Sequence, residues 1–129
     1  MRDVVFFVLS ELGSDAQVSV HLIGDTRMKS LNKKYRGKDK TTDVLSFAMG
    51  DGERWFGEIL DLGDVFVSIP QIRRQAREFG VSFKHELVRM LVHGILHTMG
   101  YDHLRPKDAK VMMPLQGKLV EQVIDKKMV

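Results

Sequence analysis

The sequence predicts an α+β fold, with a single mixed β-sheet of about four strands and about five helices packed on it. Strand-like and helix-like hydrophobic patterns both occur, but they do not alternate strictly as they would in a doubly wound fold. In addition, 129 residues with 43% hydrophobic and 29% charged side chains suit one globular domain, which we expect to span 1–129.

Apolar patterning predicts two helices and one strand in the first third of the chain. Residues 4–12 form a short apolar run ending at Gly13, and this glycine favours a helix because it suits a helix C-terminal cap. Apolar and polar residues alternate along 16–23, which predicts a strand. Asp25 then offers an N-cap for a helix over 26–36.

The middle of the chain is expected to hold the remaining strands. Residues 43–48 and 64–69 are apolar runs of the length typical of buried strands. The glycine-rich stretch 50–57 predicts a turn or loop between them. Residues 57–61 are compatible with one further short strand.

The last part of the chain is expected to hold three helices, each marked by residues typical of helix ends. The first helix is expected to start at Ser68 and Pro70 and to end at Gly80. The second starts at Ser82 and runs to about Met99, just before Gly100. The third starts at Pro106 and runs to about Lys126. Pro114 lies inside the last helix, and we expect it to kink that helix or shift its start.

The composition excludes several classes of protein. The chain has no cysteine, which excludes disulfides and thiolate metal sites, so any metal must be held by imidazole or carboxylate groups. All apolar runs are shorter than the roughly 20 residues that a membrane span needs, and no cleavage site follows the apolar stretch 4–9. We therefore expect a cytoplasmic protein that does not associate with membranes.

Three of the five histidines lie close together, in the segment HGILHTMGYDH at 93–103. His93 and His97 are four residues apart on an expected helix, so their side chains project from nearly the same face. Gly100 suits the left-handed conformation that ends a helix, and a turn there would bring His103 back toward the other two. The spacing predicts one bound ion per chain, with zinc the first candidate and another divalent transition metal the alternative.

The same offsets occur in the H-E-x-x-H-x-x-G-x-x-H zinc peptidases, with one difference. The glutamate that acts as general base in those enzymes corresponds to Gly94, and glycine cannot accept a proton. Glu86 lies on the same helix face but about 10 Å along the axis from His93, so we expect it to be structural or to act only indirectly. The sequence therefore argues against the peptidase mechanism.

A strongly basic segment precedes the first buried strand. Residues 33–40, KKYRGKDK, carry five basic side chains and one aspartate, whereas the net charge of the whole chain is +3. Such a run is often only a solvated face, and that interpretation stays open. The alternative is a phosphate-contacting patch whose lysines follow an RNA backbone without reading its sequence: Lys33, Lys34, Lys38 and Lys40.

Three blocks of sequence resemble the YbeY family of bacterial endoribonucleases and ribosomal RNA maturation factors. The segment at 93–103 is similar to that family's H-G-x-L-H-x-x-G-Y-D-H signature. LNKKYRGKDKTTDVLSF at 31–47 is similar to its L-N-x-x-Y-R-x-x-D-x-x-T-D-V-L-S-F block, and GEILDLGDVFVS at 57–68 is the third block. The resemblance is weaker after 103, where the family's last helix is usually rich in glutamate.

The resemblance implies a zincin-like metal-binding helix and a metal-dependent, single-strand-specific endoribonuclease acting in ribosomal RNA processing. By position, it implies His93, His97 and His103 as metal ligands and Arg36 as the family's functional arginine. An arginine offers a planar, bidentate donor fork to a phosphate. The expected partners are single-stranded precursor ribosomal RNA and components of the small ribosomal subunit, and no DNA.

Several roles stay open. Asp102, next to His103, either accepts an imidazole N–H and so orients it, or only forms a turn. Asp43 and Ser46 are interpreted as structural. For the protein as a whole, the alternatives to an endoribonuclease are a non-catalytic, metal-stabilised factor that binds ribosomal RNA or the ribosome, and a peptidase or other hydrolase on the same scaffold.

Overall fold

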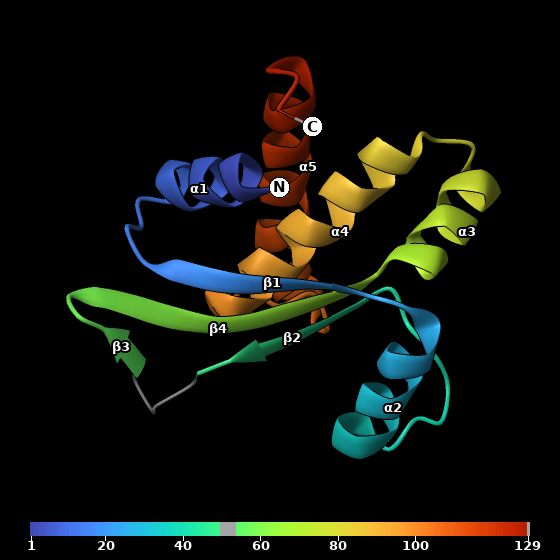
Figure 1. Cartoon of the computed structure of the whole chain (residues 1–129). Coiled ribbons are helices and arrows are strands. Elements are labelled where there is room, and N and C mark those ends of the chain that lie inside the picture. Colours follow the sequence, from blue (N-terminus) through green and yellow to red (C-terminus); the bar gives the residue numbers. More distant parts are fainter. Residues whose placement is uncertain (50–53, 129) are drawn as a thin grey trace.

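Figure 1 shows the computed structural model, which describes residues 1–49 and 54–128. Its helices and strands have these bounds: α1 (Arg2–Glu11), β1 (Gln17–Ile23), α2 (Asp25–Arg36), β2 (Val44–Ala48), β3 (Arg54–Phe56), β4 (Ile59–Ser68), α3 (Ile69–Phe79), α4 (Phe83–Thr98) and α5 (Pro106–Asp125). The predicted α+β class, with five helices in the described residues, is confirmed.

The strands form one mixed sheet with β4 at its centre. β1 runs parallel to β4 on one side and β2 runs antiparallel to it on the other, which gives the order β1-β4-β2. The three-residue β3 lies off this path and pairs antiparallel with the start of β4. In Figure 1, α1, α4 and α5 lie on one side of the sheet and α2 lies on the other.

One continuous strand, β4, occupies the region in which the pattern predicts separate strands at 57–61 and 64–69, so the predicted division is wrong. β4 stays continuous because it accommodates one extra residue opposite β1 in a β-bulge. Gly63 lies there with φ 134°, and a Cβ at this position would collide with the carbonyl oxygen of Phe47. The glycine thus bends the strand instead of ending it.

The predicted loop at 50–57 is shorter than expected. Residues 54–56 form β3, because a two-residue turn at Gly57 and Glu58 lets them pair back onto β4. Gly57 supplies the positive φ, 62°, that tight hairpin turns require. The rest of the predicted loop, residues 50–53, lies outside the described residues.

Asp25 is not the N-cap of α2, as the sequence pattern predicts, but its first residue, and Gly24 is the N-cap. The Asp25 carboxylate instead accepts hydrogen bonds from the hydroxyls of Thr41 (3.0 Å) and Ser68 (2.9 Å) and pairs with Arg74 at 2.8 Å. The hydrogen bond from Arg74, followed by those from the hydroxyls, lowers the pKa of Asp25 to about 2. This carboxylate therefore ties α2 to the loop before β2 and to the start of α3.

The remaining helices agree with the expected end signals. The helix predicted at 4–12 is present as α1, which spans Arg2–Glu11 with Leu12 as its C-cap, and Ser68 and Ser82 each accept a backbone N–H as N-caps of α3 and α4. α5 begins at Pro106, as predicted, and continues through Pro114. The internal proline, which has no N–H to donate, therefore does not shift the start of this helix.

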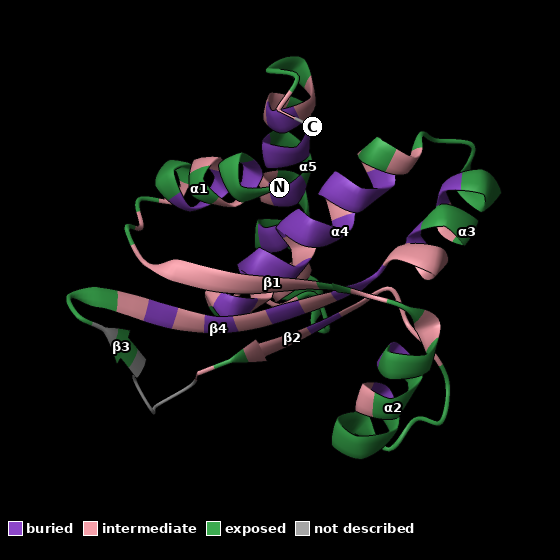
Figure 2. Ribbon diagram, viewed as in Figure 1, coloured by how far each residue is buried: buried purple, intermediate pink, exposed green. Residues whose placement is uncertain are grey.

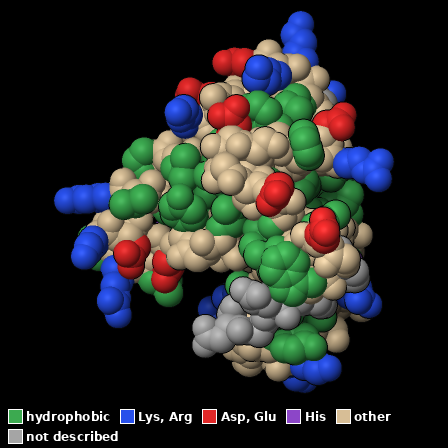
Figure 3. All heavy atoms as spheres, turned by 90° about the vertical axis from the view of Figure 1, so that its left-hand side faces the viewer, with side chains coloured by type: hydrophobic (Ala, Val, Ile, Leu, Met, Phe, Trp, Pro, Cys, Tyr) green, Lys and Arg blue, Asp and Glu red, His purple; other side chains and the backbone are tan. Residues whose placement is uncertain are grey.

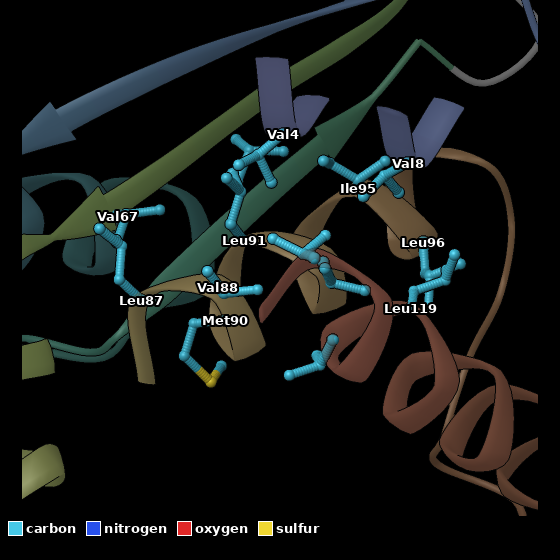
Figure 4. Close-up of a cluster of buried hydrophobic side chains, with 14 of the residues drawn as sticks. Val4, Val8, Val67, Leu87, Val88, Met90, Leu91, Ile95, Leu96 and Leu119 are labelled. Carbon is cyan, nitrogen blue, oxygen red and sulfur yellow. The ribbon is translucent and has the colours of Figure 1, made fainter. Parts of the chain in front are cut away.

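The core is built around α4. Ten of its 16 residues are buried, and it is the most continuously buried helix in Figure 2. Figure 4 shows its side chains packed among Val4 and Val8 of α1, Val67 of β4 and Leu119 of α5. Because α4 is held from several sides, side chains that leave this helix start from a rigid base.

The face of the molecule in Figure 3 carries apolar side chains in its middle and most of its lysines and arginines around the edge. Between α1 and β1 there is an apolar groove of about 540 Å³, with Val5, Phe6 and Val18 in its lining. None of the helices in the described ranges has both the length and the apolar character needed to cross a bilayer.

Candidate metal centre

The three histidines of 93–103 come together at the C-terminal end of α4. Their candidate ligand nitrogens all lie within 4.8 Å of one another. The Nε2 atoms of His93 and His97 are 3.1 Å apart, and the ring of His103 lies 4.9 and 5.1 Å from their ring centroids. Two nitrogens bound to one tetrahedral zinc at about 2.0–2.1 Å would be roughly 3.3 Å apart, so the spacing fits a single ion.

The turn after α4 brings His103 to the other two histidines. Gly100 has φ 94°, which reverses the chain just beyond the helix. Oδ1 of Asp102 then accepts hydrogen bonds from the backbone N–H groups of His103 (2.6 Å) and Leu104 (3.1 Å). The bonds from Leu104 and His103 lower the pKa of Asp102, so its contacts are those of a turn-forming aspartate.

Hydrogen bonds direct the ε nitrogens of the two helical histidines into the site. Nδ1 of His93 donates to Oε1 of Gln116, a buried residue of α5, at 2.8 Å. The backbone of Tyr101 accepts a hydrogen bond from the His97 ring. Both Nε2 atoms therefore face each other with their lone pairs across 3.1 Å. A cation between them stabilises such an arrangement.

Burial keeps these two imidazoles in the form that ligates a metal. It lowers the pKa of His93 and of His97 below the ordinary value of 6.5, although the hydrogen bonds to Gln116 and Tyr101 act in the opposite direction. A neutral imidazole has a free lone pair, whereas a protonated one cannot ligate. Donor type, spacing and protonation state thus all fit one transition-metal ion.

These pKa shifts predict how metal affinity depends on pH. Above pH 6.5, His93 and His97 are already neutral, so we expect the affinity to change little through these two groups. At lower pH, protons compete with the metal, and affinity should fall by about tenfold per pH unit for each imidazole that titrates. Competition with a chromophoric chelator at several pH values measures this.

His21, on β1 and outside the triad, provides the control for that titration. His21→Ala should bind one ion as the parent protein does, whereas His97→Ala should bind it far more weakly. Failure of the parent protein to take up any metal at neutral pH would contradict the assignment.

Gly94 explains why a peptidase-type glutamate has no place in this helix. A Cβ on Gly94 would lie 2.6 Å from Cγ1 of Val65 and 3.1 Å from Oγ of Ser46 and Cγ2 of Val44. Ser46 also donates a hydrogen bond to the Gly94 carbonyl at 3.0 Å. Position 94 therefore faces the sheet, and the close approach of α4 to β2 and β4 depends on the missing side chain.

Glu86 has the structural role expected for it. Its side chain is only 1% exposed and accepts hydrogen bonds from Arg89 at 2.7 and 2.8 Å and from Gln75 at 2.8 Å. The carboxylate thus links α3 to α4 and holds the guanidinium of Arg89.

A cleft of about 750 Å³ opens over the histidines. One wall is formed by α4 and the turn after it, and the opposite wall by the end of α2 and by β2. The lining includes these polar side chains: Arg36, Asp43, Ser46, Arg89, His93, His97, Asp102 and His103. The fold therefore brings Arg36, from the basic segment, into the same cleft as the three histidines.

The guanidinium of Arg36 is available in this cleft. Gly37 ends α2 with φ 70°, and the N–H groups of Gly37 and Lys38 already satisfy the carbonyls of Lys33 and Asn32. Among the described residues, Arg36 has no hydrogen-bond or ion-pair partner of its own. Its contacts are therefore not those of a cation that caps the helix.

The four lysines of the basic segment lie elsewhere. All are exposed and none of them lines the cleft: Lys33, Lys34, Lys38 and Lys40. Lys34 is placed over the ring of Tyr35, with its Nζ 5.2 Å from the ring centroid. Arg36 is thus the residue of this segment that reaches the cleft.

Two residues of the site were missed by sequence reasoning. Gln116 lies among the buried positions of α5, and a polar residue within an apolar helical stripe is a signal for a buried partner. Arg89 precedes His93 by four residues, as His93 precedes His97, so all three lie along one face of α4. Both signals are visible in the sequence, but the partners are not.

Comparison with known proteins agrees with this geometry. The family model described as Endoribonuclease YbeY matches residues 1–124. A protein named Endoribonuclease YbeY from Sulfurihydrogenibium sp. is 41% identical over 125 residues, which cover 95% of this chain and 81% of that protein. One of the same name from Lacticaseibacillus casei is 41% identical over 114 residues, covering 85% and 75%.

A solved structure has the same fold. The solution structure of TM1509 from Thermotoga maritima matches with a TM-score of 0.71 and 31% sequence identity, over 98% of this chain and 81% of that one. The family model and the relatives, together with the three sequence blocks, show that this chain belongs to the Endoribonuclease YbeY family.

Proposed function

We propose that the protein is a metal-dependent endoribonuclease that cleaves single-stranded RNA in the maturation of ribosomal RNA. The observation that carries this proposal is one cleft lined by three imidazoles and by Arg36, which has no hydrogen-bond or ion-pair partner among the described residues. The names of the relatives support cleavage of RNA.

The three histidines and Arg36 have distinct roles in this proposal. His93, His97 and His103 hold one ion, zinc in the first instance or another divalent transition metal, which when bound supplies a Lewis acid for a phosphoryl oxygen. Arg36 binds the same phosphate through its bidentate donor fork and fixes its orientation. Three protein ligands leave room at the ion for the substrate.

The shape of the site supports a single-stranded substrate. His93 and His97 are half-buried within the cleft, where the flexible backbone of a single strand reaches more readily than that of a rigid duplex. Precursor ribosomal RNA is the proposed substrate, with components of the small ribosomal subunit as partners and the cytoplasm as the location. A peptidase is disfavoured because position 94 has no room for its glutamate.

The exposed lysines are proposed to attract the RNA backbone. If they do, binding should weaken steeply with salt, because each neutralised phosphate releases counterions. Replacing Lys33, Lys34, Lys38 or Lys40 with alanine should then lower the slope of log affinity against log salt by roughly one. Fluorescence anisotropy with a labelled single-stranded RNA measures the slope.

Lys118→Ala is the matched control, since Lys118 is exposed on α5 and outside the cleft. Its slope should equal that of the parent protein. The proposed function itself is tested in the same samples by cleavage of the RNA. Binding without any cleavage would favour the non-catalytic assembly factor, and no binding to RNA would contradict both.

A further inference from the structure

Asp43 is a carboxylate of the cleft to which the proposed reaction assigns no role. It stands just before β2 and lines the cleft on the wall opposite α4. The pKa of His93, although lowered chiefly by burial, is raised in part by the negative charge of Asp43. Asp43 lines the same cleft as His93, His97 and His103, so its carboxylate borders the space that a group bound at the metal centre would enter.

The backbone around Asp43 holds this side chain in place. Its own carbonyl accepts the N–H of Ser68 at 3.0 Å, which attaches the residue to β4. Its Oδ1 accepts the N–H of Val44 at 2.7 Å and the hydroxyl of Thr42 at 3.3 Å. The hydrogen bonds to Oδ1 therefore fix the side chain of Asp43, and the hydrogen bond to its carbonyl fixes the main chain.

The other carboxylate oxygen, Oδ2, has no hydrogen-bond partner among the described residues. A purely structural aspartate at the start of a strand needs only Oδ1, which already caps Val44. Asp43 is half-buried, and its Oδ2 can still accept a hydrogen bond in the cleft. The other aspartate that lines this cleft, Asp102, accepts hydrogen bonds from the backbone of its own turn.

The chemistry of this acceptor selects its ligand. A carboxylate oxygen repels phosphate but accepts a hydrogen bond from a hydroxyl, and Arg89, on the facing helix, offsets part of its charge. The hydrogen bonds that Arg89 donates to Glu86, followed by the negative charges of Glu86 and then of Asp43, raise the pKa of Arg89. In a nucleic acid, the hydroxyl next to a backbone phosphate is the ribose 2′-hydroxyl, which DNA lacks.

We propose that Asp43 binds a ribose 2′-hydroxyl beside the scissile phosphate and so sets the preference for RNA over DNA. This proposal rests on the proposed function. It gives Asp43 a role in substrate recognition beyond the structural one that the sequence suggests. A site built to hydrogen-bond a hydroxyl discriminates strongly against an analogue without it, because the acceptor is then left unpaired.

The test compares the affinities of the metal-loaded protein for single-stranded RNA and for DNA of the same sequence. Asp43→Ser is the informative variant, because the serine hydroxyl can still cap Val44 while nothing replaces Oδ2. We expect the ratio of the two affinities to fall about tenfold, the value of one hydrogen bond to a charged group. Asp43→Asn should largely keep the ratio, because the 2′-hydroxyl both donates and accepts.

Asp39→Asn is the matched control, since Asp39 is exposed and pairs with Lys29 outside the cleft. Its ratio should equal that of the parent protein. An unchanged ratio in Asp43→Ser, or an equal loss in Asp43→Ser and Asp43→Asn, would overturn the proposal, the latter by showing that charge alone matters. If the parent protein neither binds nor cleaves RNA, the proposed function fails instead, so the two failures are distinguishable.

Discussion

Replacing Gly94 with glutamate is expected to disrupt the fold rather than create a peptidase. The Cβ alone would lie 2.6 Å from Cγ1 of Val65, whose side chain is fully buried. Overpacking by a methyl group typically costs about 1–3 kcal/mol, and a buried carboxylate without a partner adds several more. Loss of cooperative thermal unfolding, followed by circular dichroism, measures the effect.

Alanine at the same position separates the packing effect from that of charge. Gly94→Ala should lower the free energy of unfolding by about 1–2 kcal/mol, because the clash exceeds the gain in helix propensity. Gly117→Ala is the matched control, since a Cβ at this position of α5 meets nothing within 4 Å. That variant should stabilise the protein by up to about 1 kcal/mol. Equal stabilisation by both would show that position 94 has room.

Arg36→Lys is expected to remain folded, to keep its metal and yet to lose RNA cleavage almost as completely as Arg36→Ala. Lysine retains the positive charge but lacks the planar fork that binds a phosphate through two parallel hydrogen bonds. Removing one preorganised donor to a transition state typically costs about 10²–10³ in rate. Single-turnover cleavage by samples of equal metal content measures the loss.

Arg77→Lys is the control for that series, because Arg77 is exposed on α3 and outside the cleft. It should cleave RNA at the parent rate. Near-normal cleavage by Arg36→Ala would end the catalytic interpretation. Recovery of activity in Arg36→Lys alone would reduce the role of Arg36 to its charge.

The parts of the site that depend on local chain geometry could be predicted from the sequence. His93 and His97 share a helix face because they are four residues apart, and Gly100 permits the reversal that returns His103. The serine caps of α3 and α4 are local in the same sense. Each of these features requires only a few neighbouring residues to specify it.

Features that depend on contacts between distant segments could not be predicted. Aspartate is a residue type typical of N-caps, but the carboxylate of Asp25 binds tertiary partners more than ten residues away instead. The hydrogen bond between Gln116 and His93 joins α5 to α4. Likewise, the bulge at Gly63 depends on the pairing of β4 with β1, which no periodicity within β4 reveals.

The most direct test is single-turnover cleavage of one single-stranded RNA by the parent protein before and after its metal is removed and restored. The account predicts that the chelated protein stays folded and is inactive, and that activity returns in proportion to added zinc, or a related transition metal, up to one ion per chain. His97→Ala should not recover at the same metal concentration. Equal cleavage rates with and without metal, or no cleavage by the fully loaded protein, would contradict the account.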